Sequence, residues 1–340
     1  MKNSRRFYIQ NKRDKIRFFT FLILAVLVSA AASLCLGAVY VSPAQTLQAL
    51  LEGEEGTSAY SIILYARLPR TCGSLLAGSA LAVSGAVIQS VLDNPLAAPN
   101  IIGVNAGAGL AVALFCAAAP TAVALVPAAA FLGALGSVLL VLMIAERTGA
   151  SRMTLVLAGV AISNVLGAGI DAIVTLAPDA LIGYSDFRIG GLANVPMSRI
   201  IPAFWVIAAA LAAVFSLAGD LDILALGVDT ARSLGLAAKR TRLILLALAA
   251  ALAGAAASFS GLLGFVGLIV PHIIRSVTGQ ESRLLLAASA LGGAAFLTAS
   301  DLLARLLFAP YELPVGIILS LAGGPFFIVL LLRQRGGRLP

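Results

Sequence analysis

Long uncharged apolar runs alternate with short charged segments along most of the chain, from Phe18 to Leu332. A helix of about 20 apolar residues spans the roughly 30 Å hydrocarbon core of a membrane, so each run is a candidate transmembrane helix. The runs are unbroken stretches of Ala, Leu and Val, unlike the short alternating strands of a membrane β-barrel. The ten predicted spans are 18–40, 71–91, 101–119, 122–145, 153–176, 199–219, 243–260, 262–277, 284–308 and 313–332. The pattern therefore predicts an all-α integral membrane protein of about ten helices.

The composition agrees with lipid as the main solvent. Hydrophobic residues make up 60% of the 340 positions and charged residues only 11%, which is more apolar surface than a soluble chain of this length could bury. The 33 glycines indicate close helix packing, because small residues let two backbones approach each other in lipid. We expect a basic cytoplasmic N-terminus over 1–17, a single transmembrane domain over 18–333 and a cytoplasmic tail over 334–340.

The first apolar run has a signal peptide as its competing interpretation, because it follows a basic segment and contains small residues at 29–32. The apolar region of a signal peptide is about 7 to 15 residues long. Here the uncharged run continues as far as Glu52. We therefore expect a retained first helix.

The distribution of Lys and Arg sets the predicted orientation. With ten spans and a cytoplasmic N-terminus, 18 of the 23 basic residues fall in cytoplasmic segments, in keeping with the positive-inside rule. Only Ser260 and Gly261 separate the seventh and eighth spans. If these two spans were one, every later loop would change side and the C-terminal basic cluster would face outward. Both termini are therefore expected in the cytoplasm; the resemblance described below implies that the membrane is a bacterial inner or sole plasma membrane.

Charge and cysteine content exclude two further classes of function. The net charge of +8 comes from basic residues scattered over loops and termini, without the aromatic-interleaved patch expected of a nucleic-acid-binding protein. Cys35, Cys72 and Cys116 all lie in apolar segments and lack paired or metal-ligand spacing. We therefore expect no nucleic-acid partner and no metal site on this chain.

Two stretches in the first third of the chain carry more specific patterns. Arg67 and Arg70 flank Leu68 and Pro69, a proline that favours a helix start, just ahead of the second span. Residues 94–99 read NPLAAP, and their two prolines disfavour helix between the second and third spans. Irregular backbone at membrane depth is tolerated where protein or a water-filled cavity surrounds it, so residues 94–99 are a candidate pathway element or an inter-helix turn.

Two further stretches lie in the second half of the chain. Residues 221–236 form the longest cytoplasmic segment and predict a short helix from Asp229 to Leu234, closed by Gly235 as a C-terminal cap. A membrane-parallel helix with exposed apolar residues needs a partner surface. Residues 260–275 read SGLLGFVGLIVPHIIR, and 301–305 with 312–316 continue this pattern.

In this order, the four stretches resemble the permease subunits of bacterial ABC importers for iron-siderophore complexes, haem and cobalamin. The resemblance covers about residues 20–333 and extends to the FecCD-type and cobalamin importer permeases. It implies the type II ABC importer permease fold, with ten helices in each subunit. It also implies several partners: a second permease copy or a close paralogue, two ATPase subunits that carry ATP and Mg, and an extracytoplasmic substrate-binding protein.

The resemblance also implies roles for individual residues. Arg67, Arg70 and Arg305 match the family's outer arginines, which receive carboxylates of the binding protein, and charge pairs of this kind steer encounter and fix register. The segment at about 220–241 matches the loop that couples to the ATPase, at Leu226, Gly227, Ala231, Arg232, Leu234 and Gly235. The pathway candidates are Asn94, Pro95, Leu96, Pro99, Gly264 and Pro271. Residues 187–195 lack the tryptophan that relatives usually carry there, so this segment does not indicate a substrate.

Two functions of other classes remain open from the sequence. Asp171 and Asp301 lie within apolar spans, and intramembrane charge is typical of a proton-coupled secondary transporter. Asp301 has an ordinary alternative role, because Arg305 follows it at four residues' spacing. His272 is the single histidine and lies near no cluster of potential metal ligands, so a membrane enzyme is disfavoured. The chain lacks the Gly-rich phosphate loop that ends in Lys-Ser or Lys-Thr, so it holds no ATP site of its own.

The sequence therefore predicts a transport permease that is not an enzyme and binds no cofactor itself. The expected cargo is a ferric siderophore that a binding protein delivers, with haem or cobalamin as alternatives. Sequence alone does not distinguish a homodimeric permease pair from a heterodimeric one.

Overall fold

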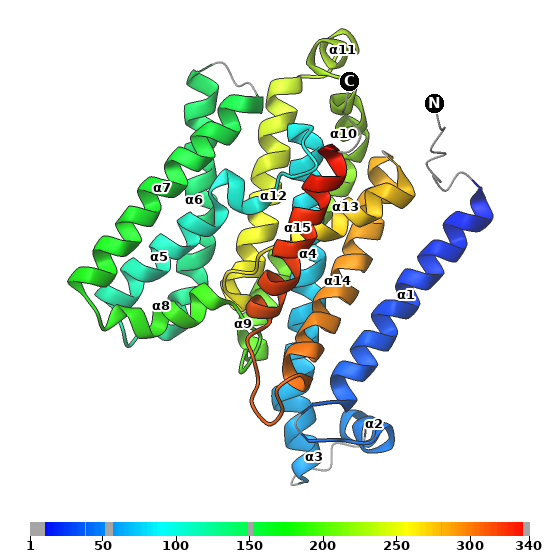
Figure 1. Cartoon of the computed structure of the whole chain (residues 1–340), viewed down its shortest axis with the longest axis vertical. Helices are drawn as coiled ribbons and strands as arrows, with labels where there is room; N and C mark the ends of the chain where they lie inside the picture. The colour runs from blue at the N-terminus through cyan, green and yellow to red at the C-terminus, as the bar shows by residue number, and fades with distance from the viewer. Residues whose placement is uncertain (1–10, 38, 52–56, 149–151, 280, 336–340) are drawn as a thin grey trace.

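The computed structural model describes residues 11–37, 39–51, 57–148, 152–279 and 281–335. Over these ranges the chain is helical and contains no strand. Figure 1 shows long helices that run between two ends of the molecule, with α11, the start of α1 and the end of α15 at one end and α2 and α3 at the other. We refer to these as the α11 end and the α2 end.

The elements follow the chain in a simple order. They are α1 (Lys12–Cys35), α2 (Pro43–Leu51), α3 (Ser58–Ser61), the π-helix η1 (Ile62–Arg67), α4 (Leu68–Leu92), the 3₁₀-helix η2 (Pro99–Ile102), α5 (Val104–Ala118), the 3₁₀-helix η3 (Val123–Leu125), α6 (Val126–Arg147), α7 (Arg152–Leu176), α8 (Ala180–Ile189), α9 (Met197–Ser216), α10 (Ala218–Ala225), α11 (Val228–Ser233), α12 (Ala238–Ser260), α13 (Val266–Thr278), α14 (Ser282–Leu306) and α15 (Val315–Arg335).

Each of the ten predicted spans overlaps one apolar helix. Seven helices of the described chain are long and apolar enough to cross a membrane. Three shorter apolar helices, Val104–Ala118, Val266–Thr278 and Val315–Leu330, correspond to the third, eighth and tenth predicted spans. The division between the seventh and eighth spans is confirmed, because α12 ends at Ser260 and α13 begins at Val266. The number of membrane crossings and the orientation remain predictions.

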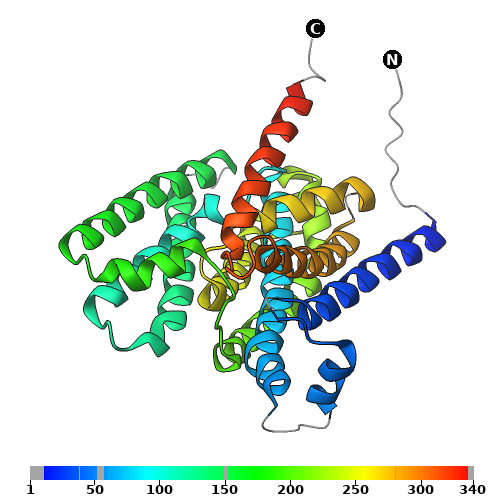
Figure 2. The same ribbon diagram turned by 60° about the horizontal axis from the view of Figure 1, so that its bottom comes forward.

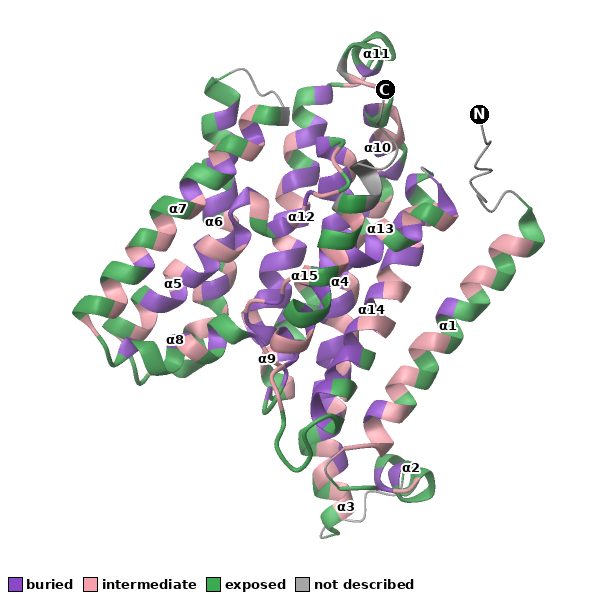
Figure 3. Ribbon diagram, in the orientation of Figure 1, coloured by how far each residue is buried: buried purple, intermediate pink, exposed green. Residues whose placement is uncertain are grey.

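Helix α4 forms the centre of the bundle and is almost entirely buried (Figure 3). It crosses α14 where Gly78 meets Gly293, and a Cβ atom on either glycine would overlap the backbone carbonyl of the other. It crosses α13 where a Cβ on Gly85 would overlap the carbonyl of Gly267. Backbones meet at both crossings, as expected where lipid provides no hydrophobic drive between helices.

The remaining helices flank this centre on two sides. Figure 2 shows α5, α6, α7 and α8 grouped on one side and α1 on the other. Helix α1 packs against α14, and most of its surface is exposed or half-buried. Because α1 and α7 expose Leu, Val and Ile side chains along their length, these outer faces suit contact with lipid.

Helical structure begins well before Pro69, contrary to the sequence prediction. Helix α3 starts at Ser58 and continues through η1 into α4, so Pro69 lies inside a helical stretch. Proline lacks an N–H and normally disrupts the hydrogen bonding of the preceding turn. Here that turn is a π-helix, in which the N–H of Leu68 reaches back to the carbonyl of Ile63. This wider turn accommodates the proline without ending the helix.

Helical structure extends into the basic N-terminal segment, and its expected cytoplasmic location stays a prediction. Helix α1 already begins at Lys12, so the last residues of the predicted cytoplasmic segment 1–17 are helical. Residues 1–10 and 336–340 lie outside the described residues.

Candidate functional site

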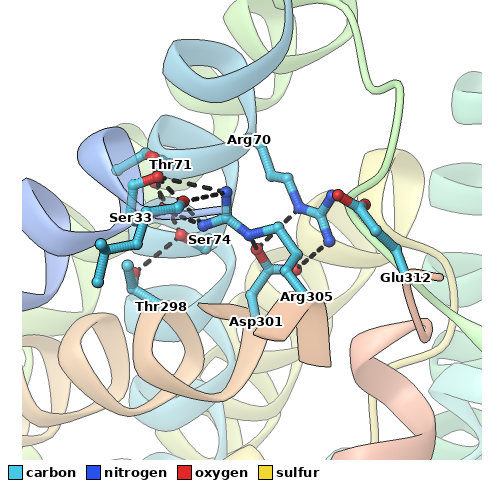
Figure 4. A network of polar contacts seen from close by, with 9 residues as sticks. Ser33, Arg70, Thr71, Ser74, Thr298, Asp301, Arg305 and Glu312 are labelled. Atoms are coloured by element: carbon cyan, nitrogen blue, oxygen red, sulfur yellow. Dashed lines mark hydrogen bonds and ion pairs between the residues drawn. The ribbon is translucent and has the colours of Figure 1, made fainter. Parts of the chain in front are cut away.

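A buried ion cluster lies at the α2 end, between α4 and α14 (Figure 4). Arg70 donates two hydrogen bonds to Asp301, from Nε to Oδ2 at 2.8 Å and from Nη2 to Oδ1 at 3.1 Å. Its Nη1 donates to Glu312 in the connection between α14 and α15. Arg305, one turn after Asp301 on α14, lies 3.5 Å from the same carboxylate. The cluster thus joins two cations and two anions.

Hydroxyl groups extend this cluster to α1. Arg305 Nη2 donates to Ser33 Oγ at 2.7 Å and to the Ser33 carbonyl at 3.2 Å. Ser33 Oγ in turn lies 2.8 Å from Thr71 Oγ1 on α4, and Ser74 Oγ lies 2.8 Å from Thr298 Oγ1 on α14. Three helices are therefore joined by polar contacts inside the bundle, where unsatisfied polar groups are costly.

Arg67 binds backbone carbonyls. Its Nη1 donates to the carbonyls of Leu34 and Cys35 at 2.8 Å each, and its Nη2 donates to the carbonyl of Val39. These acceptors lie at and just after the C-terminus of α1, where helix carbonyls lack partners within the helix. Arg67 thereby fixes the end of α1 against the start of α4.

The three arginines predicted to dock a binding protein are buried. Arg67, Arg70 and Arg305 are 5%, 7% and 2% exposed, and the hydrogen bonds described above point into the chain. This differs from the exposed outer cations that the sequence led us to expect. The physical reason is that Asp301, Glu312 and the α1 carbonyls lie within reach and compensate the charges inside the protein. Their direct contact with a binding protein remains a prediction.

A cavity of about 710 Å³ opens beside the ion cluster. Arg70 and Glu312 lie on its wall, together with most of 186–195, the segment that follows α7 and includes the end of α8. Aromatic side chains of Phe115, Phe187 and Phe259 add apolar surface. The segment that departs from the family pattern therefore lines a cavity at the α2 end, which sequence reasoning did not predict.

Helix α8 is held against α5 beside this cavity. A Cβ added to Gly109 would lie 3.5 Å from the Tyr184 hydroxyl, and one added to Gly183 would lie 3.1 Å from Cys116 Sγ. Burial raises the pKa of the Tyr184 phenol, so this side chain stays neutral and packs as an apolar group. The close packing positions Asp186, whose side chain is exposed on the cavity wall.

The predicted pathway segment 94–99 is irregular, as its prolines indicated. Asp93 ends α4 in the left-handed conformation at φ +49°, and the Asn94 side chain accepts a hydrogen bond from the Leu96 N–H at 3.0 Å. Pro99 then begins η2 and packs beside Gly267 of α13. The segment lies on protein, which explains why irregular backbone is tolerated here.

Gly264 lies in the reversal between α12 and α13, and Pro271 lies inside α13. Phe265, next to Gly264, adopts φ +66° and packs against Gly323 of α15. Pro271 lies within α13 and does not end it. None of the six pathway candidates lines the 710 Å³ cavity, so their role in a pathway remains a prediction.

The predicted coupling segment forms two short helices at the α11 end. Helix α11 runs from Val228 to Ser233 and closes as predicted at Gly235, which has φ +82°. The Gly235 N–H bonds to the Arg232 carbonyl and the Leu236 N–H to the Ala231 carbonyl, the two bonds of a Schellman cap. Helix α10, from Ala218 to Ala225, was not distinguished from the loop in the sequence.

The coupling candidates divide by exposure. Ala231 is fully buried and holds α11 on the bundle, whereas Leu226, Arg232, Leu234 and Gly235 are exposed. Leu226 and Leu234 are 63% and 60% exposed at the α11 end. Gly227 permits the turn between α10 and α11 at φ +104°. The exposed candidates Leu226, Arg232 and Leu234 thus offer apolar and basic side chains at the α11 end.

These features can be compared with known proteins. The model of the FecCD transport family matches residues 23–333. The chain belongs to the FecCD transport family. It is 36% identical to the hemin transport system permease protein HmuU of Yersinia pestis, over 94% of this chain and 96% of that protein. It is also 36% identical to the Fe(3+) dicitrate transport system permease protein FecD of Escherichia coli, over 94% and 100% of the two chains.

A solved structure supports the assignment to the FecCD family. An inward-facing metal-chelate type ABC transporter has a chain that superposes with a TM-score of 0.82 and 26% identity, covering 94% of this chain and 99% of that one. This FecCD permease is therefore a multi-pass protein of the cell membrane, and its relatives are transport subunits rather than enzymes. His272 lies edge-to-face with Phe326, and the described residues contain no group of three His, Cys, Asp or Glu side chains suited to a metal.

Three site residues escaped the sequence analysis. Ser33 and Glu312 complete the ion cluster, and Asp222 on α10 accepts a hydrogen bond from the backbone of α14. The sequence did indicate that partners such as Ser33 and Glu312 should exist. Arg70, Asp301 and Arg305 lie near apolar spans, and buried charges require partners. The pairing of Arg70 with Asp301 was missed because the two residues are 231 positions apart.

Proposed function

We propose that this FecCD permease is the membrane subunit of an ATP-driven importer of a ferric siderophore. Two permeases, each a copy or close paralogue of the other, would pair around a central pathway. Two ATPase subunits would bind ATP and Mg, and an extracytoplasmic protein would deliver the chelate. The observation that carries this proposal is the match of the family model over residues 23–333, together with relatives named for hemin and ferric dicitrate transport.

The α11 surface supports the ATPase partner. Its exposed leucines need a covering surface, and Arg232 adds a positive charge beside them. The rigid Schellman cap holds α11 in one conformation, as a helix that transmits force requires. We propose that residues 220–241 follow the ATPases when ATP binding closes them, and that this movement changes which side of the pathway is open.

The α2 end is the proposed docking side for the binding protein. The buried arginines would shape this surface and keep their predicted role in receiving carboxylates if the cluster opens on docking. Glu312 supports this proposal, because its side chain is 37% exposed while its partner Arg70 is buried. Replacing Arg188, an exposed cation on α8, by glutamate would test surface steering without breaking the cluster.

A proton-coupled carrier receives less support. Asp301 is held by Arg70 and Arg305 and is 1% exposed, so it is not an isolated carboxylate that protons reach easily. Asp171 is exposed on α7, so it is the carboxylate that still supports a proton-coupled carrier. The two mechanisms differ in their energy source, which makes them separable by experiment.

The test is uptake of a radiolabelled ferric siderophore by proteoliposomes that hold this permease, its ATPase and its binding protein. We expect accumulation that requires internal ATP and all three proteins. If the binding protein stimulates the ATPase but no siderophore accumulates, the cargo assignment is wrong and haem or cobalamin should be assayed. Uptake by the permease alone would contradict the ATP-driven mechanism.

A further inference from the structure

The N-terminus of α14 is capped by another helix. Glu281, the residue before α14, has extended backbone at φ −65° and ψ 108°, but its side chain makes no cap. Instead, Asp222 of α10 accepts a hydrogen bond through Oδ1 from the backbone N–H of Ser282 at 2.8 Å. Ser282 is the first residue of α14, where the N–H has no partner within the helix. A carboxylate at this position also interacts favourably with the helix dipole.

Asp222 stands next to the proposed ATPase contact. Leu221 and Leu224 on both sides of it are buried in the core and fix α10 to the bundle. Only Leu226 and Gly227 connect α10 to α11. A displacement of α11 is therefore passed within a few residues to Asp222.

Helix α14 reaches from this point to the ion cluster. Its 25 residues correspond to about 37 Å at 1.5 Å per residue. It contains no proline, in contrast to α9, α13 and α15, so it lacks one common cause of a kink. Asp301 and Arg305 lie in its last two turns, where they hold Arg70 and the main-chain carbonyl of Ser33.

We infer that Asp222 is a positioning residue that transfers movement of α11 to α14, and through α14 to the ion cluster at the α2 end. This inference rests on the proposed function, because it takes α11 to be the part that the ATPase moves. Asp222 itself need not contact cargo or nucleotide. Its role is to make α10 and the first turn of α14 move together.

Four variants test this role in the full importer in proteoliposomes. Asp222→Ala removes the acceptor, and Ser282→Pro removes the donor at a position where proline suits a helix. Asp222→Asn keeps an Oδ1 acceptor. Glu281→Gln is the matched control, because it removes a carboxylate beside Ser282 whose exposed pair with Lys15 contributes little.

The decisive measurement is the amount of chelate transported per ATP hydrolysed. We expect this ratio to fall severalfold in Asp222→Ala and in Ser282→Pro, because the first turn of α14 is then no longer bound to α10. The double variant should fall no further than either single variant, and Asp222→Asn and Glu281→Gln should match the wild type. A merely destabilising change would lower the amount of assembled complex but leave the ratio unchanged, and that result in Asp222→Ala would overturn the inference.

Hydrogen exchange of the permease in nanodiscs gives a second measurement that does not need a cargo. Asp222→Ala should speed amide exchange in the first turn of α14 and in 307–314, the connection beside the cluster. Faster exchange at 307–314 distinguishes transfer along α14 from a local loss of the cap. Exchange unchanged in 307–314 would overturn the inference even if transport is impaired. If the wild-type importer moves no chelate while the exchange result holds, the proposed function fails and the mechanical link stands.

Discussion

Arg70 on α4 binds Glu312 in the connection before α15, although the two residues are 242 positions apart in the sequence. The same guanidinium holds Asp301, so one side chain ties the connection between α14 and α15 to the buried centre of the bundle. Glu312 is the most exposed of the four charged members and lines the cavity at the α2 end. It is therefore the member that an arriving partner or ligand would reach first.

Removing the central carboxylate should destabilise the protein strongly. Asp301→Asn leaves Arg70 and Arg305 buried without their shared anion, and breaking a buried ion pair costs about 3–5 kcal/mol. Chemical unfolding in detergent micelles measures this loss. Glu312→Gln is the control, and it should cost about 1 kcal/mol or less because its carboxylate is partly solvated. Equal losses in the two variants would contradict the central position of Asp301.

The glycine crossing between α4 and α14 should not tolerate a methyl group. Gly78→Ala would place a Cβ on the Gly293 carbonyl and separate the two helices, at a cost of about 1–3 kcal/mol. Gly136→Ala on α6 is the control, because open space surrounds its Cβ position and alanine favours helix. Thermal unfolding should show a lower midpoint for the first variant and an unchanged or higher one for the second. An unchanged unfolding midpoint in Gly78→Ala would mean that α4 and α14 pack less closely at this crossing than described.

The cap of α11 should be required for ATPase coupling. Gly235→Val forces a β-branched residue into φ +82°, which costs about 1–3 kcal/mol of local strain. Because α11 has only six residues, we expect this strain to release it and to lower ATP-dependent uptake. Gly219→Ala on α10 meets no neighbouring atoms and should keep wild-type uptake. Co-purification of the ATPase subunit measures the same effect without transport, and normal co-purification with normal uptake would contradict it.

The cavity at the α2 end should be accessible from outside the cell. Cys116 lines it, so a membrane-impermeant maleimide added to intact cells should label Cys116 in a Cys35→Ser, Cys72→Ser background. Gly183→Val should reduce labelling, because a side chain there would lie against the Cys116 sulfur. Labelling only after the cells are opened would reverse the predicted orientation.

The helices themselves were predictable from the sequence, because one local property determines them. An uncharged run of about 20 residues indicates a span wherever it occurs, and the predicted limits of 153–176 and 284–308 differ from α7 and α14 by at most two residues. The α11 cap was equally local, since Gly235 follows the last turn directly. Short helices such as α8 and α10 were missed because their length and composition do not separate them from loops.

The site was less predictable because it depends on contacts between distant segments. The sequence marked Arg67, Arg70 and Arg305 as important but placed them on the surface. Burial depends on whether a counter-charge lies nearby in space, and Asp301 and Glu312 are more than 230 positions from Arg70. The Asp222 cap could not be predicted either, because Asp222 lies 60 positions from Ser282 and outside α14.

The glycine contacts at the centre of the bundle have a consequence for measuring motion. With no side chains between α4 and either α13 or α14 at these crossings, the three helices have little room to slide past one another. The helix axes should therefore stay in contact at these crossings through the transport cycle, so that α14 can pivot about Gly293 but cannot separate from α4. Spin labels on α4 and α14 beside the Gly78–Gly293 crossing would provide an internal ruler, against which movement of the α14 ends and of the α5 to α8 group can be read in each nucleotide state.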